Sequence, residues 1–223
     1  MNGKAVIFDL DGTLVDTAPD LTRATNHVLQ LSGRPAVSVD EVRGMVGRGA
    51  RKLIALGFER TGAEVEPERL DELFGVFVDF YAANIAVDSR LFPGARAVLD
   101  RCRDGDIALG ICTNKLEGLS RRLVEELGLA DYFGAIVGQD TVKAAKPDPR
   151  PYHEALRQLG VATGRSLFVG DSEIDVRTAR AAGVPIIGMS FGYTERPVAD
   201  FGPDYLAADY GELWPLIEQA LDS

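Results

Sequence analysis

Short apolar runs recur along this chain, and segments of helical periodicity separate them. Runs of this kind, without alternating polar residues, are typical of strands buried on both faces of a parallel sheet. The helical segments between them end at glycines, as helices commonly do. The alternation therefore predicts an α/β fold with a doubly wound parallel-sheet (Rossmann-like) core. The expected strands are 5–8, 107–112, 135–137, 167–169 and 184–189, and the expected helices include 117–127, 151–159 and 175–182.

The pattern changes between residues 17 and 88, where no buried-strand run occurs. Large apolar residues return there at helical spacing, as at Phe77 and Tyr81. We therefore expect an inserted helical domain at 17–88, within an α/β core made of 1–16 and 89–223. Such an insertion would lie above the carboxyl ends of the strands, where open α/β sheets bind their ligands.

Charge and cysteine content narrow the function classes. The chain carries 24 Lys and Arg against 34 Asp and Glu, a net charge of −10, which argues against binding to nucleic acid or an anionic membrane. An anionic substrate would therefore depend on a few local cations. The two cysteines, Cys102 and Cys112, cannot form a disulfide framework, and the apolar run 5–8 is too short for a secretory signal or a membrane span. We expect a cytoplasmic protein.

The first candidate for chemistry is the sequence Asp-Leu-Asp-Gly-Thr, which directly follows the run 5–8. Asp9 and Asp11, two residues apart, share one side of an extended chain. Gly12 allows a backbone turn there that a side chain would obstruct. Taken alone, the motif fits a strand-end turn or a helix cap equally well.

Each later strand also ends in polar residues. Thr113 and Asn114 follow the second strand, Lys146 precedes a Pro-Asp-Pro segment after the third, and Asp171 and Asp175 follow the fourth. Because the carboxyl ends of parallel strands meet at one edge of a sheet, we expect these side chains to converge. Carboxylates, a hydroxyl and a lysine together suit the binding of a hard cation and a phosphoryl group. Aspartates favour Mg²⁺, and no histidine cluster or thiolate pair offers zinc a site.

With these four motifs in this order, the sequence resembles the haloacid dehalogenase (HAD-like) superfamily, specifically its phosphatase branch with a helical cap inserted after the first strand. The resemblance covers essentially the whole chain, and four motifs in order are far more specific than any one of them. It implies an enzyme that hydrolyses phosphomonoesters in two steps. Mg²⁺ would be the cofactor, and a small anionic phosphorylated metabolite would be the substrate.

The resemblance implies a role for each acidic residue. Asp9 would be the nucleophile that forms an aspartyl-phosphate, and its carboxylate would also bind Mg²⁺. Asp11 would act as general acid and then as general base, and would ligate the metal through its backbone carbonyl. Asp171 would be the second side-chain ligand of the metal. Asp175 would act through water or by orienting Lys146.

Thr113 and Lys146 would contact the phosphoryl oxygens, where charge accumulates during transfer. The flanking prolines restrain the backbone at Lys146 and favour it over Lys143, which lacks that setting. Asn114 would either bind phosphate or cap the following helix, and the sequence favours neither role over the other.

The inserted helical domain should select the substrate. Arg48 and Arg51 lie beside two glycines just before an apolar helical segment, and backbone N–H groups at a helix start can hold a carboxylate together with a guanidinium. The stretch is similar to that of phosphoglycolate phosphatases, whose substrate carries a carboxylate beside the phosphate. This resemblance implies phosphoglycolate as the leading substrate. A solvated loop with surface arginines explains either arginine alone equally well.

Other functions fit less well. The segment 188–192 matches the G-x-S-x-G nucleophile elbow of α/β-hydrolases, but that fold needs a later histidine, and His27 and His153 both precede Ser190. The P-loop motif of kinases and NTPases does not occur. Asp11 argues against a dehalogenase, which needs no leaving-group acid. A sugar-phosphate phosphatase or phosphomutase and a non-catalytic phosphate-binding module are the alternatives, and the sequence leaves both a monomer and a homodimer open.

Overall fold

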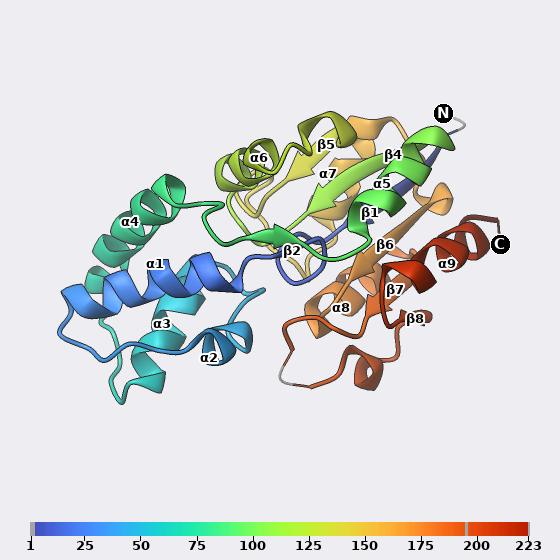
Figure 1. The fold of residues 1–223 in the computed structure, drawn as a ribbon. Coiled ribbons are helices and arrows are strands. Elements are labelled where there is room, and N and C mark those ends of the chain that lie inside the picture. The colour runs from blue at the N-terminus through green and yellow to red at the C-terminus, as the bar shows by residue number, and fades with distance from the viewer. Residues whose placement is uncertain (1–2, 195, 223) are drawn as a thin grey trace.

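The computed structural model describes residues 3–194 and 196–222, and a parallel six-stranded sheet lies at its centre (Figure 1). The strand order is β5-β4-β1-β6-β7-β8, and every neighbouring pair is parallel. The first strand in the chain therefore occupies the middle of the sheet. The strands are β1 (Lys4–Phe8), β4 (Ile107–Cys112), β5 (Ala135–Val137), β6 (Ser166–Gly170), β7 (Ile186–Met189) and β8 (Tyr205–Ala207).

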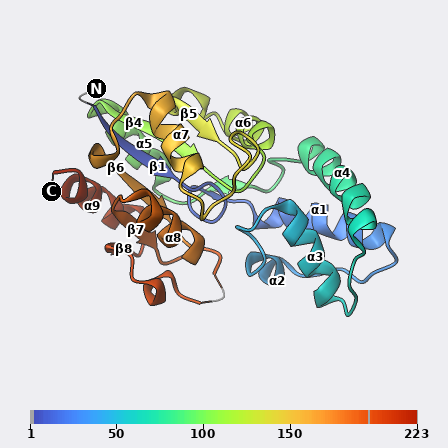
Figure 2. The ribbon, with the colours of Figure 1, turned by 180° about the vertical axis from the view of Figure 1, so that it is seen from behind.

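Helices cover both faces of this sheet (Figures 1 and 2). Alternate side chains of β1 enter two separate apolar cores, with Val6 and Phe8 in one and Ala5 and Ile7 in the other. This arrangement confirms the predicted doubly wound α/β fold. The first core lies under α5 (Ala95–Asp104), α6 (Glu117–Glu126) and α9 (Tyr210–Asp222), and the second lies under α7 (Arg150–Leu159) and α8 (Glu173–Ala182).

The expected strands and helices are present, with shifts at some ends. The apolar run at 184–189 becomes a strand only from Ile186, because Pro185 has no N–H group to donate to the sheet. Helix α8 begins before the expected residue 175, because Ser172 caps it and accepts a hydrogen bond from the backbone N–H of Asp175. The sequence did not predict the edge strand β8.

Between residues 17 and 89 the chain forms four helices that pack on one another beyond the carboxyl ends of β1 and β4 (Figure 1). The chain leaves the sheet through β2 (Val15–Asp16) and returns through β3 (Arg90–Leu91), and these two short strands pair antiparallel. The helices are α1 (Ala18–Leu31), α2 (Val39–Arg43), α3 (Ala50–Arg60) and α4 (Pro67–Ala83). Among the described residues, no helix has the length and apolar character needed to cross a membrane.

Candidate active site

The site lies where β1, β4 and β6 end. Sheet hydrogen bonding continues one residue past the strands, because the Asp9 N–H donates to Val169 O at 2.9 Å and the Thr113 N–H donates to Val137 O at 3.0 Å. These bonds fix the backbone of both residues at the sheet edge. Asp171 is also buried and follows β6 directly. The structure therefore brings the three strand ends together, as expected for a parallel sheet.

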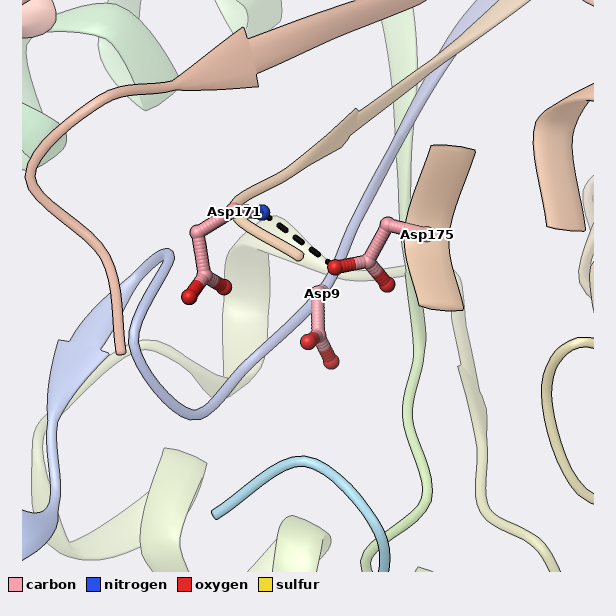
Figure 3. A group of neighbouring side chains, drawn as sticks. All are labelled: Asp9, Asp171 and Asp175. Atoms are coloured by element: carbon pink, nitrogen blue, oxygen red, sulfur yellow. Dashed lines mark hydrogen bonds between the residues drawn. The ribbon is translucent and has the colours of Figure 1, made fainter. Parts of the chain in front are cut away.

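Three carboxylates form a cluster at this edge (Figure 3). Asp9, Asp171 and Asp175 are all buried, and each offers a carboxylate oxygen within 4.8 Å of the others. Burial raises the pKa of Asp9 to about 7, although Lys146 counteracts part of this effect. Burial, reinforced by the charges of Asp175 and Asp9, raises the pKa of Asp171 to about 8. The buried surroundings therefore disfavour the charged forms of Asp9 and Asp171, so both bind a proton more readily than an exposed aspartate does.

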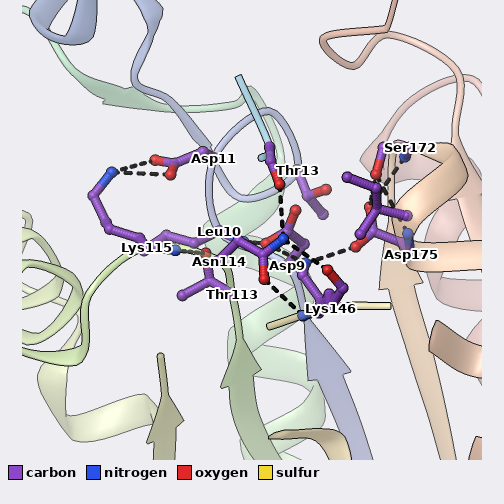
Figure 4. A network of polar contacts seen from close by, with 12 residues as sticks. Asp9, Leu10, Asp11, Thr13, Thr113, Asn114, Lys115, Lys146, Ser172 and Asp175 are labelled. Carbon is purple, nitrogen blue, oxygen red and sulfur yellow. Dashed lines mark hydrogen bonds and ion pairs between the residues drawn. The ribbon is translucent and has the colours of Figure 1, made fainter. Parts of the chain in front are cut away.

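Lys146 supplies a positive charge to the cluster (Figure 4). Its Nζ lies 2.8 Å from Asp9 Oδ1 and 2.7 Å from Asp175 Oδ1, and the side chain is almost wholly buried. Burial alone would lower the pKa of Lys146, but Asp175 and Asp9 together outweigh it and raise that pKa above its ordinary value. Lys146 is therefore a permanent cation between the two carboxylates.

Asp175 holds both Lys146 and the loop that follows β6. Its Oδ2 accepts hydrogen bonds from Ser172 Oγ at 2.6 Å (Figure 4) and from the backbone N–H of Asp171 at 3.2 Å (Figure 3). The Ser172 N–H also donates to Asp175 Oδ2 at 3.1 Å, and the Asp175 N–H donates to Ser172 Oγ, so the two residues form a capping box at the start of α8. Asp175 thus contacts Lys146 directly while it fixes the backbone of Asp171.

Asp171 is oriented by neighbours from distant parts of the chain. Its Oδ1 accepts from Thr13 Oγ1 at 2.7 Å, and its Oδ2 accepts from the Tyr193 N–H at 2.7 Å. A Cβ at Gly192 would lie 2.0 Å from Asp171 Cβ, so only glycine fits beside this carboxylate. Gly192, which belongs to the G-x-S-x-G match, is therefore explained by the close approach of Asp171. In the described residues after β7, the 3₁₀ helix 198–201 is the next helical element, so the strand-turn-helix of a hydrolase elbow is absent.

Asp11 points away from the cluster, toward a second lysine (Figure 4). Its two carboxylate oxygens lie 2.8 and 2.9 Å from Lys115 Nζ, and one of them also accepts from Thr17 Oγ1 at 2.7 Å. The sequence prediction missed Lys115, which is buried. Its position two residues after Thr113, at a strand end already singled out, was the signal that could have found it.

Asn114 joins segments of the chain. Its Nδ2 donates to Gly47 O at 3.0 Å and to Lys146 O at 3.2 Å, while its Oδ1 accepts from the Lys146 N–H. Both amide hydrogens are used, so the structure does not direct this side chain at a phosphate. The helix-capping alternative is wrong, because Leu116 occupies the N-cap of α6.

A cavity lies between the sheet edge and the inserted helices. Asp9, Asp11, Thr113 and Lys115 line it from the sheet side, and apolar residues together with Tyr81 line it from the helices. Among the described residues, Lys115 is the one lysine or arginine that lines it.

Neither arginine expected to read the substrate lines this cavity. Arg51 is exposed on α3, pairs with Asp71 and stacks over the Phe74 ring at 4.3 Å. Arg48 is also exposed, and it borders a different hollow, beside Glu173. The structure therefore gathers the predicted strand-end residues but leaves these two arginines outside.

Comparison with known sequences places the chain in a family. Residues 6–189 match the family described as haloacid dehalogenase-like hydrolase. The chain is 45% identical over 204 residues to the phosphoglycolate phosphatase of Caulobacter vibrioides, a match that covers 92% of this chain and 86% of that protein. It is also 41% identical over 217 residues to the phosphoglycolate phosphatase of Agrobacterium fabrum, with 97% and 93% of the two chains covered.

Solved structures share the whole fold. A crystal structure described as a predicted phosphoglycolate phosphatase from Haemophilus somnus superposes with a TM-score of 0.89 at 27% identity, and the match covers 97% of this chain and 98% of that one. Sequence and fold therefore agree over nearly the full length. The chain is therefore a member of the haloacid dehalogenase-like hydrolase family, and within it a phosphatase.

Proposed function

We propose that this protein hydrolyses phosphomonoesters through an aspartyl-phosphate on Asp9, with Mg²⁺ as cofactor and phosphoglycolate as the leading substrate. One observation carries the proposal. The Asp9 carboxylate lies at the end of the central strand, 2.8 Å from Lys146 Nζ, and borders a cavity that Asp11 and Thr113 also line. The nucleophile, the acid and a phosphoryl-binding hydroxyl thus border one cavity, and the phosphoryl-binding cation contacts the nucleophile.

The carboxylate cluster fits a hard divalent cation. Lys146 balances Asp9 and Asp175, whereas the described contacts of Asp171 come from a hydroxyl and a backbone N–H without a full positive charge. The donors are all oxygens, which Mg²⁺ prefers. Asp9, Asp171 and the Asp11 carbonyl would hold the ion, with Asp175 acting through water. When bound, Mg²⁺ supplies positive charge that neutralises the phosphoryl group.

In the first step, a carboxylate oxygen of Asp9 attacks phosphorus and forms a new P–O bond. The bond from phosphorus to the substrate alkoxide breaks, and its electron pair leaves with the alkoxide oxygen. Asp11 gives that oxygen a proton, so the alcohol departs neutral. Thr113 and Lys146 contact the phosphoryl oxygens and stabilise the charge that builds on them.

In the second step, water attacks the phosphorus of the aspartyl-phosphate. Asp11, now a carboxylate, takes a proton from this water. The P–O bond to Asp9 breaks and returns the electron pair to the Asp9 carboxylate, which releases inorganic phosphate. The net reaction converts a phosphomonoester and water into an alcohol and phosphate, and both aspartates regain their starting forms.

The relatives support phosphoglycolate over a sugar phosphate, the substrate of the alternative. The similar proteins from Caulobacter vibrioides and Agrobacterium fabrum bear the name phosphoglycolate phosphatase.

The inserted helices complete the proposal as a cap. Residues 17–88 would form the cap domain and residues 1–16 and 89–223 the catalytic core, with the crossing at β2 and β3 between them. The cap contributes the apolar wall of the cavity. Cys102 and Cys112 are free and buried, which fits the reducing conditions of the cytoplasm.

A panel of phosphorylated metabolites tests the proposed function. We expect phosphoglycolate to give the highest kcat/KM for phosphate release in the presence of Mg²⁺, and we expect a chelator to abolish release. The Asp9→Asn variant, checked for an unchanged fold by circular dichroism, serves as the inactive control. Highest kcat/KM on a sugar phosphate would support the alternative, and binding of phosphate esters without any turnover would support a non-catalytic module.

A further inference from the structure

Lys115 is a buried cation that the two hydrolysis steps do not use. Its side chain is only 5% exposed and projects from the loop after β4 into the cavity (Figure 4). Burial alone would lower the pKa of Lys115, but the Asp11 carboxylate outweighs this effect and raises it, so the ammonium stays charged. Lys146 is already committed to Asp9 and Asp175. Lys115 therefore remains as the cation of the cavity for a second anionic group.

Tyr81 provides a second polar group beside Lys115. It belongs to α4 of the inserted helices, is 1% exposed and lines the same cavity. Lys115 Nζ lies over its ring, 4.7 Å from the centroid. The Lys115 ammonium interacts electrostatically with the Tyr81 oxygen, and among the described residues the Tyr81 hydroxyl is the one buried side-chain nitrogen or oxygen atom without a hydrogen-bond partner. A buried hydroxyl without a partner is costly, and a ligand with an acceptor oxygen would satisfy it.

We propose that Lys115 and Tyr81 form the subsite for the substrate's carboxylate, which takes the Lys115 ammonium from Asp11 and accepts a hydrogen bond from the Tyr81 hydroxyl. This inference rests on the proposed function and names the residues that determine its specificity. It moves carboxylate recognition from Arg48 and Arg51, which lie outside the cavity, to groups that line it.

The exchange also couples recognition to catalysis. Lys115 holds both carboxylate oxygens of Asp11, and Thr17 holds one of them. In that arrangement Asp11 is directed at its own partners and not at a leaving oxygen. A substrate carboxylate that engages Lys115 releases Asp11 to turn toward the scissile bond. A substrate with a neutral tail leaves the Lys115–Asp11 pair in place, so the subsite selects on rate as well as on binding.

Binding measurements test the subsite without turnover. In the Asp9→Asn background with Mg²⁺, calorimetry compares phosphoglycolate with ethyl phosphate, which has the same two-carbon skeleton without the carboxylate. Lys115→Met should weaken phosphoglycolate binding by roughly ten- to a hundredfold, and Tyr81→Phe by about three- to tenfold. Both should change ethyl phosphate binding by less than about twofold. Lys52→Met, which removes an exposed lysine of α3, is the matched charge control.

Turnover by the otherwise wild-type enzyme gives a second readout. Lys115→Met and Tyr81→Phe should lower kcat/KM for phosphoglycolate by similar factors, with a fall in kcat as well as a rise in KM for Lys115→Met. For ethyl phosphate, kcat/KM should fall by a smaller factor in Lys115→Met than it does for phosphoglycolate, because this ester has no carboxylate to lose. Tyr81→Phe keeps the ring, so its result counts even if Lys115→Met folds poorly.

Specific outcomes would overturn the subsite. Equal losses on both esters would mean that Lys115 and Tyr81 only support the fold or Asp11. Unchanged phosphoglycolate binding in both variants, with a loss in Arg48→Ala, would return recognition to the arginine. Failure of the proposed function would look different, because the wild-type enzyme would then release no phosphate from either ester, while the binding comparison would still decide the subsite.

Discussion

Asp9 and Asp11 are close neighbours in the chain, yet they meet different partners. Asp9 contacts Lys146 at the carboxylate cluster, while Asp11 contacts Lys115 and Thr17 on the side of the inserted helices. This separation suits two different tasks. In the proposed mechanism, Asp9 is held in place as the nucleophile, and Asp11 exchanges partners as the acid and base.

Asp11→Asn should remove proton transfer and leave the nucleophile intact. We expect kcat to fall by about 10²- to 10⁴-fold on alkyl phosphates, because proton transfer by a positioned group contributes about that much. The loss should shrink on p-nitrophenyl phosphate, whose leaving group needs no proton. Rates for a series of esters with different leaving-group pKa values measure this. A loss that is the same across the series would contradict the assignment.

Gly192→Ala should disturb the proposed metal site without replacing any of its ligands. The new Cβ would lie 2.2 Å from Asp171 Oδ2 and 2.0 Å from its Cβ, so the carboxylate must move. We expect the Mg²⁺ concentration for half-maximal activity to rise by about tenfold or more. Gly118→Ala is the control, because a Cβ there meets nothing within 4 Å. An unchanged Mg²⁺ requirement in Gly192→Ala would argue against Asp171 as a ligand.

The sequence predicted which strand-end residues would gather, because parallel strands place their carboxyl ends at one edge whatever the loops do. Asp9, Thr113, Lys146 and Asp171 followed from that rule. Lys115 also stands at a strand end, but its burial could not be predicted, because that burial depends on helices from the inserted segment. How the inserted helices pack over the strand ends is a tertiary property, and the hydrophobic pattern of the strands carries no information about it.

Whether a strand could be predicted from the sequence depended on its hydrophobic pattern. The expected runs along β1 and β5 are buried on both faces, as is β4 from Leu109 onward, so each forms a continuous apolar stretch in the sequence. Edge strand β8 has three residues, of which Ala207 alone is buried, and such a short segment carries no clear period. The β2 and β3 pair is shorter still, and its two strands lie far apart in the sequence.

One buried carboxylate ties the two chain crossings together. Asp20, near the start of α1, accepts hydrogen bonds from the backbone N–H groups of Asp88 and Ser89 and from Ser89 Oγ, at distances between 2.7 and 3.1 Å. The side chain of Asp20 is wholly buried. It therefore anchors the departing helix to the returning segment just before β3.

Asp20→Ala should destabilise the protein through these unpaired donors. A buried donor left without a partner costs about 1–3 kcal/mol, so a loss of at least that size in the free energy of unfolding is expected. Chemical denaturation measures it. Asp71→Ala, which breaks an exposed ion pair with Arg51, should cost less than about 1 kcal/mol. Equal effects of the two variants would mean that Asp20 does not anchor the crossing.

At the scale of the whole molecule, a net charge of −10 surrounds a site built for anionic substrates. Local organisation resolves this conflict. Lys115 and Lys146 are both buried at the sheet edge, where low polarity strengthens their interaction with anions. The surplus of acidic residues on the chain therefore does not prevent phosphate binding.

The carboxylate cluster makes stability depend on pH and metal. Asp9 and Asp171 have pKa values of about 7 and about 8 in the folded state, above the roughly 3.9 of an unfolded aspartate. The folded protein therefore keeps protons that the unfolded chain has lost. These bound protons contribute fully to the free energy of unfolding below about pH 4, and their contribution disappears as the pH rises through 7 and 8.

Metal-free protein should therefore lose stability between about pH 5 and pH 8, and Mg²⁺ should restore most of it at the upper end. The Asp171→Asn variant has one fewer of these carboxylates, so its free energy of unfolding should fall less steeply over the same range. Denaturant titrations of both proteins, with chelator and with Mg²⁺, give the slopes. If the free energy of unfolding of the variant fell as steeply with pH as that of the wild type, the raised pKa of Asp171 would be contradicted.

Trapping the intermediate tests whether Asp9 carries the phosphoryl group during hydrolysis. The enzyme is mixed with Mg²⁺ and phosphoglycolate, quenched in acid within milliseconds, digested and analysed by mass spectrometry. We predict that the peptide containing Asp9 gains one hydroxylamine-labile phosphoryl group, and that Asp9→Asn gains none and releases no phosphate. A phosphoryl group on a different residue, or near-normal turnover by Asp9→Asn, would contradict the mechanism.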